Sequence, residues 1–219
     1  MNLNKRRILF FSYDAGGANV TMAYAYFMNK EGYEEKCYPR GPAYEIFAHH
    51  IPELIARDTE LSFLDTDIVI TGTSGIHSNY ELEMIQRSKA IVSKVITILD
   101  STAEFKIRFT INDIYLRSEF IPDEIWVEDG NFKSGVQAFD IHLKQCDNYY
   151  MKYLKEVYYE KPIKITNKSI YTYKNGYLLI LTEYLSELFG NKYGFSEFDY
   201  CVSILDSIIK KTKSIFKAI

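Results

Sequence analysis

The chain has 219 residues, of which 47% are hydrophobic and 25% are charged, and its formal net charge is -3. This composition is typical of a globular protein with a substantial core, and the slightly negative charge argues against a broad surface for nucleic acid. No apolar run approaches the roughly 18 residues of a membrane-spanning helix, and the apolar stretch near the N-terminus is too short for a secretion signal. We therefore expect a cytoplasmic protein without a transmembrane segment.

Short apolar runs alternate with longer amphipathic stretches, which is typical of a parallel sheet whose strands are connected by helices. The strands are expected at 7–12, 34–42, 66–75, 92–101, 122–129 and 161–167. The helices are expected at 19–33, 43–55 with a break at Pro52, 81–91, 103–110 and 131–139. The pattern predicts an α/β fold in which a Rossmann-like open parallel sheet, flanked by helices, occupies residues 1–166.

The last part of the chain differs in character. Residues 167–176 are polar and rich in turn-forming residues, and we interpret them as a linker. An apolar strand is expected at 177–185 and an amphipathic helix at 194–216. Residues 177–219 are thus a strand–helix extension, too small to form a domain alone. They pack on the first domain, form a dimer, or are the remnant or start of a second Rossmann-like domain.

The cysteines Cys37, Cys146 and Cys201 are far apart and form no CxxC pair, so neither a disulfide framework nor a metal site is expected. The chain also lacks the GxGxxG motif of dinucleotide-binding proteins and the GKS or GKT of a P-loop. These absences argue against an NAD(P)-dependent enzyme, and we expect no cofactor.

The stretch SYDAGGANV, residues 12–20, connects the first expected strand to the first expected helix. Gly16 and Gly17 allow a tight turn and close approach of a ligand, and a helix that begins near Asn19 directs its free N–H groups to the same point. The turn is therefore a candidate site for a phosphate, a carboxylate or a polar sugar edge. Asp14 is a candidate catalytic residue, suited to hold or deprotonate a hydroxyl group. The alternative is that Asp14 and Asn19 only cap the helix.

The stretch TGTSG, residues 71–75, is a second glycine-containing turn after an expected strand. In an open parallel sheet both turns lie at one edge, where ligands bind at the reversal in strand order. Thr73, Ser74 and Gly75 are therefore candidate ligand-binding residues. The alternative is that they only end the strand.

A third expected strand ends at Asp100, which is the second candidate catalytic residue. If the segment that follows is helical, Glu104 and Arg108 lie four residues apart and pair on one helix face. Both are candidate ligand-binding residues. The alternative is a surface ion pair, which would contribute little to stability.

These motifs resemble the N-terminal half of GT-B-type glycosyltransferases and of their relative, the UDP-GlcNAc 2-epimerase, most closely the polysaccharide-biosynthesis members of that group. The similar stretches are ILFFSYDAGGAN at 8–19, DIVITGTSG at 67–75 with a glutamate after it, ITILDSTAEFKIRF at 96–109 and PDEIWVED at 122–129. The resemblance implies that Gly16 and Gly17 lie near an acceptor or donor phosphate and Asp14 near the reacting hydroxyl. The turn at 73–75 would form the opposing wall.

In GT-B enzymes the N-terminal domain binds mainly the acceptor, and a second Rossmann-like domain binds the nucleotide-sugar. The donor-binding segments of that second domain have no counterpart after residue 177. The resemblance therefore implies a GT-B-like glycosyltransferase, or the acceptor-binding half of one, that acts on a sugar or sugar phosphate in cell-surface polysaccharide biosynthesis. The alternative is a non-catalytic ligand-binding or assembly module that forms a homodimer or binds a partner chain through its C-terminal helix.

Overall fold

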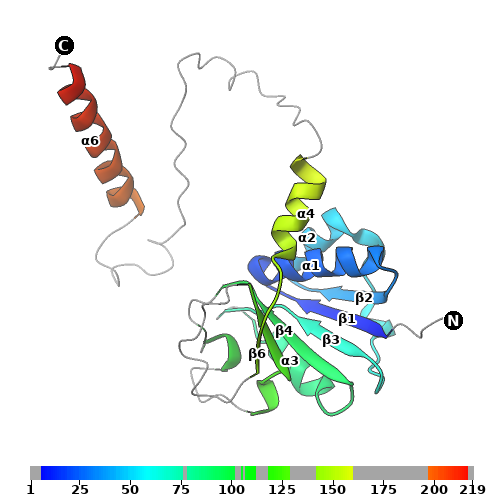
Figure 1. The fold of residues 1–219 in the computed structure, drawn as a ribbon. Coiled ribbons are helices and arrows are strands. Elements are labelled where there is room, and N and C mark those ends of the chain that lie inside the picture. The colour runs from blue at the N-terminus through cyan, green and yellow to red at the C-terminus, as the bar shows by residue number, and fades with distance from the viewer. Residues whose placement is uncertain are drawn as a thin grey trace. The chain divides into compact units, whose positions relative to one another are not determined.

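The computed structural model describes residues 6–75, 78–101, 105, 107–111, 118–128, 142–159 and 197–216. Within these residues the chain forms one six-stranded sheet, in which every neighbouring pair of strands is parallel (Figure 1). The strands are β1 (Arg7–Ser12), β2 (Glu34–Pro39), β3 (Ile68–Thr71), β4 (Lys94–Leu99), β5 (Glu124–Val127) and β6 (Leu143–Gln145). The predicted α/β fold with a Rossmann-like parallel sheet is confirmed.

The helices around this sheet are α1 (Ala15–Lys30), α2 (Pro42–His50), α3 (Tyr80–Ser88) and α4 (Tyr149–Leu154). One π-helical turn, Lys155–Tyr159, continues α4. Short 3-10 turns lie at Pro52–Leu54, Asp58–Glu60, Ile107–Phe109 and Ser118–Phe120.

The strand order is β2-β1-β3-β4-β5-β6, so the chain reverses its direction across the sheet between β1 and β3. An isolated parallel bridge between Cys37 and Ile55 adds one further position outside β2. With that position counted as a strand, the order matches that of the doubly wound dinucleotide-binding folds. In such sheets ligands bind at the carboxyl ends of the strands, beside the reversal.

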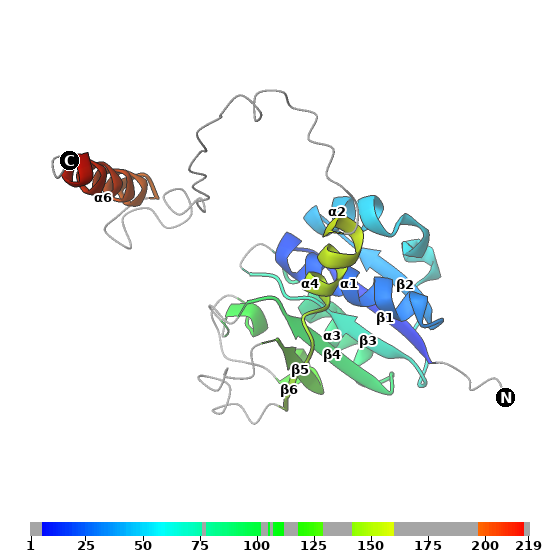
Figure 2. The same ribbon diagram turned by 45° about the horizontal axis from the view of Figure 1, so that its top comes forward.

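Helices cover both faces of the sheet (Figure 2). Ile8 and Phe10 of β1 pack in the core on the side of α1, α2 and α4. Leu9 and Phe11 pack in the core on the side of α3 and the 3-10 turns. Because both faces are buried, β1 is a continuous apolar run rather than an alternating one.

Most of the predicted elements are confirmed. β2 lies at one edge of the described sheet. The helical segment after it breaks at Pro52, as the sequence predicts. Neither β6 nor α4 was predicted from the sequence, because the LKQ of β6 is too short to form an apolar run. The helix expected at 131–139 and the strand expected at 161–167 lie outside the described residues.

The chain divides into two compact units, Met1–Ile163 and Lys164–Ile219. In the second unit the described element is α6 (Glu197–Phe216), which corresponds to the helix predicted near the end of the chain. The predicted linker at 167–176 and the strand at 177–185 lie outside the described residues. Across the part of the chain that is described, no helix is both long and apolar enough to cross a membrane.

The N-terminus of α1 lies very close to the loop after β3. A Cβ atom added to Gly17 would lie 2.8 Å from both the backbone N and the backbone O of Thr73. Gly72 lies against the helix from the loop side, since a Cβ atom added to it would lie 3.0 Å from the Cα and C atoms of Gly17. The absence of side chains at these two glycines therefore lets the helix pack directly on the loop.

Replacing Gly17 by alanine is expected to lower the free energy of unfolding by about 1–3 kcal/mol, because backbone atoms must shift to accept the methyl group. This loss outweighs the higher helix propensity of alanine. Urea denaturation of the full chain measures the effect. Gly75→Ala is the control, since nothing lies within 4 Å of its Cβ position, and it should change stability by less than about 0.5 kcal/mol. Equal losses in the two variants would contradict this role for Gly17.

Candidate functional site

The turn between β1 and α1 differs from the expected one. α1 begins at Ala15 rather than near Asn19, so Gly16 and Gly17 belong to its first turn. Neither glycine has a positive φ angle, so neither is required for a left-handed backbone. As in any α-helix, the first N–H groups have no partner within the helix, and they carry its positive dipole end. These N–H groups lie at the carboxyl edge of the sheet, beside the strand reversal.

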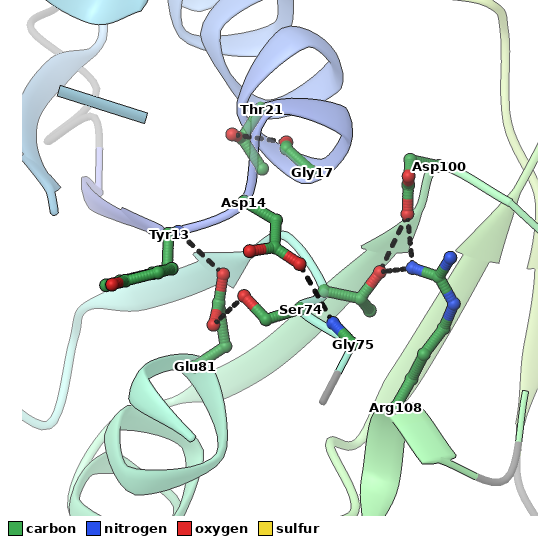
Figure 3. A network of polar contacts seen from close by, with 10 residues as sticks. Tyr13, Asp14, Gly17, Thr21, Ser74, Gly75, Glu81, Asp100 and Arg108 are labelled. Atoms are coloured by element: carbon green, nitrogen blue, oxygen red, sulfur yellow. Dashed lines mark hydrogen bonds and ion pairs between the residues drawn. The ribbon is translucent and has the colours of Figure 1, made fainter. Parts of the chain in front are cut away.

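Asp14 occupies the N-cap position of α1, but its side chain makes no capping hydrogen bond to the helix. Its Oδ2 instead accepts a hydrogen bond of 2.9 Å from the backbone N–H of Gly75 (Figure 3). Asp14 thus connects the two turns that the sequence places at one edge. Asn19 lies in the second turn of α1 and is half-buried. Within the described part of the chain, no hydrogen bond connects Asn19 to the other candidate residues.

Glu81, near the start of α3, connects the same two turns a second time (Figure 3). Its Oε1 accepts a hydrogen bond of 2.7 Å from the backbone N–H of Tyr13. Its Oε2 accepts one of 2.8 Å from the hydroxyl of Ser74. Glu81 is only 2% exposed, which is rare for a carboxylate unless its oxygens have partners.

Burial raises the pKa of Glu81 to about 7. The hydrogen bonds from Ser74 and Tyr13 act in the opposite direction, and the nearby charge of Asp14 raises the pKa further. Glu81 therefore changes its protonation state near neutral pH. It lies between two turns that both face the carboxyl edge of the sheet.

Asp100, directly after β4, forms a compact group with Arg108 and Thr73 (Figure 3). Nη1 of Arg108 lies 2.6 Å from Oδ1 of Asp100 and 2.6 Å from the hydroxyl oxygen of Thr73. The Thr73 hydroxyl is also 2.8 Å from Asp100 Oδ1. A Cβ on Gly16 would overlap the Asp100 carboxylate, so this group lies directly against the first turn of α1.

The predicted ion pair between Glu104 and Arg108 stays a prediction, because Glu104 lies outside the described residues. Arg108 itself lies in the 3-10 turn Ile107–Phe109 rather than in a described α-helix. Its partners at the site are Asp100 and Thr73, which come from two other strand ends. The sequence separation of four residues could not reveal these partners.

Two carboxylates of the site were missed in the sequence. Glu81 could have been suspected because it is the second residue of the helix that follows the second glycine turn. The second missed carboxylate is Glu128, which directly follows β5, just as Asp100 directly follows β4. Its Oε2 accepts a hydrogen bond of 2.6 Å from Asn148, and its Oε1 is buried without a hydrogen-bond partner among the described residues. Burial, together with the charge of Asp100, raises the pKa of Glu128.

A hollow of about 400 Å³ lies apart from these carboxylates. It is lined mainly by apolar and aromatic side chains: Ile8, Tyr24, Met28, Tyr33, Ile68, Ile70, Ile96, Trp126, Lys144, Gln145, Cys146, Asp147 and Tyr149. None of the candidate residues at the carboxyl edge lines it. A polar ligand therefore finds more suitable binding groups at the strand ends than in this hollow.

Among the residues that are described, no group of three or more histidine, cysteine, aspartate or glutamate side chains is arranged to hold a metal ion. No protein-family model matches the chain, and no curated protein matches it significantly. The interpretation of the site therefore depends on its geometry and on the resemblance in the motifs.

The raised pKa of Glu81 predicts a pH-dependent stability. In the unfolded chain its pKa returns to about 4.5, so the folded state binds the proton more tightly than the unfolded state does. This tighter proton binding contributes to the free energy of unfolding in full below pH 4.5, and the contribution is lost as the pH rises to about 7. Glu81→Gln, which is always neutral, should therefore gain about 3 kcal/mol relative to the unmodified chain over this range.

Urea denaturation at a series of pH values measures this difference. Glu45→Gln, at an exposed position in the first turn of α2, is the control and should change stability by less than about 1 kcal/mol. A constant difference between Glu81→Gln and the unmodified chain would show that Glu81 does not titrate in this range.

Proposed function

We propose that this chain is a GT-B-like glycosyltransferase, or the acceptor-binding half of one, that binds a sugar or sugar phosphate at the carboxyl edge of its sheet. The observation that supports this most directly is the convergence of two turns and two further strand ends beside the strand reversal. Asp14, Gly75 and Glu81 connect the turns, and Asp100 and Glu128 follow the next two strands. Ligands of doubly wound sheets bind at this position.

The chemistry of these groups suits a sugar. Carboxylates accept hydrogen bonds from hydroxyl groups, and several of them at one edge favour a ligand with many hydroxyls over a polyanion. Arg108 and the N-terminus of α1 are positive groups at this edge, and both suit a single phosphate. A phosphorylated sugar or a nucleotide-sugar combines these two features. Cell-surface polysaccharide biosynthesis is the setting that the motif resemblance supports.

A thermal-shift screen of the full chain against UDP-, GDP- and CDP-sugars and sugar phosphates tests this proposal. A ligand that binds the folded state at 100 times its Kd stabilises it by about 2.7 kcal/mol, which raises Tm by several degrees. Arg108→Lys keeps the charge but loses the planar fork of donors, and it should weaken binding about tenfold.

Arg7→Lys is a matched control, because Arg7 forms a similarly enclosed pair with Asp67 at the amino end of the sheet. It should leave ligand affinity unchanged. Equal weakening in both variants would place the ligand elsewhere, and the absence of any shift in the folded chain would contradict the proposal. Gly17 is unsuited to this test, because a substitution there disturbs packing before it disturbs a ligand.

The second candidate function is a non-catalytic assembly module, and α6 supports it. Large apolar side chains on this helix are exposed, from 42% for Ile208 to 66% for Phe198. Such exposure on an amphipathic helix is typical of a surface that binds another chain.

Removal of residues 194–219 should convert an oligomer to a monomer if α6 mediates assembly. Light scattering of the full and the shortened chain measures the mass of each. A full chain that is already monomeric would contradict the assembly function.

A further inference from the structure

Glu81 is a buried carboxylate placed between the two turns of the candidate site, and the proposed function assigns it no contact with the ligand. Of its two acceptors, one binds the backbone of Tyr13 before α1 and the other binds the side chain of Ser74 before α3. These partners lie 68 and 7 residues away in sequence. One side chain therefore sets the spacing of both turns.

The two hydrogen bonds of Glu81 differ in whether their direction can reverse. The Tyr13 N–H group can only donate, so Oε1 of Glu81 must accept in either protonation state. The Ser74 hydroxyl can donate or accept. When Glu81 is ionised, Ser74 must donate its proton to Oε2. When Glu81 is protonated on Oε2, the carboxyl group donates and Ser74 accepts, and the Ser74 proton is then free for another acceptor.

Among the described residues, two titratable groups near Glu81 bear on its protonation. Asp14 faces it across the turn and adds negative charge. Tyr80, its neighbour on α3, has a pKa that burial raises, and its hydroxyl donates to the backbone O of Tyr38. Tyr80 is therefore neutral over the range in which Glu81 changes state.

We propose that Glu81 is a positioning residue whose protonation reverses its hydrogen bond with Ser74 and thereby strengthens the binding of an anionic sugar ligand at this edge. The inference rests on the proposed function, since it requires a ligand there. Two effects act in the same direction. The neutral acid removes one negative charge beside Asp14, and the Ser74 hydroxyl becomes available to donate to a phosphate or sugar oxygen.

Calorimetric titration of the full chain with UDP-, GDP- and CDP-sugars at pH 6 and pH 8 tests the inference. The diphosphate of these ligands does not change its protonation state in this range, so a change in affinity reports the protein. If only the protonated form of Glu81 is competent, affinity at pH 8 should be about tenfold lower than at pH 6. Glu81→Gln, whose amide can accept from Tyr13 and donate to Ser74, should bind equally well at both values.

Two further variants separate this role from a merely structural one. Glu81→Asp keeps the charge but is one methylene shorter, so it should bind more weakly at both pH values. Ser74→Ala should reduce the pH dependence to the part that comes from the charge of Glu81. Binding by the unmodified chain that is the same at pH 6 and pH 8 would overturn the inference and leave the proposed function intact. A pH dependence that persists in Glu81→Gln would also overturn it. No binding of any of these ligands at either pH would overturn both.

Discussion

The carboxylate of Glu81 is the group on which the geometry of the carboxyl edge depends. A carboxylate that is 2% exposed loses nearly all its hydration, and this cost is offset only if both oxygens find donors. The donors here belong to the turn after β1 and to the turn after β3. Burial of the Glu81 carboxylate therefore depends on the donors of the two turns, and the spacing of the two turns depends on Glu81. The contact between Asp14 and Gly75 lies beside this bridge and repeats the same connection.

A second constraint is the close packing of α1 on the loop after β3. Gly17 and Gly72 lie back to back, and Gly16 lies against Asp100. The consequence is electrostatic as well as steric. Close packing brings the positive end of the α1 dipole next to the carboxylates of the edge, and in particular next to the ion pair of Asp100 with Arg108. The helix terminus thus moderates the repulsion among groups of like charge.

The carboxylates of the edge have different environments, and this determines what each one can do. Asp100 has a cation beside it, while Glu128 has a raised pKa and an oxygen without a partner in the described part of the chain. Glu81 is fully enclosed and connects the turns. Carboxylates with perturbed pKa values of this kind cluster at functional sites. None of these three carboxylates lines the apolar hollow.

The sequence alone determined that the chain forms a parallel α/β sheet and at which strand ends the polar groups gather. Buried parallel strands are continuous apolar runs, and turn residues follow them directly, so β1, β3 and β4 and the turns at 12–20 and 71–75 are local features. The break at Pro52 is equally local, because proline lacks the N–H that a helix interior needs.

The tertiary structure alone decided how these pieces meet. The two glycines suggested a turn, since glycine is a poor helix former, but they form the first turn of α1, where Gly17 packs on Thr73 and Gly16 on Asp100. The partners of Arg108 and Glu81 come from distant strand ends, and no spacing along the chain encodes them. Propensity and periodicity are properties of neighbouring residues. Hydrogen bonds, burial and pKa values at this edge depend on residues that become neighbours only when the sheet has formed.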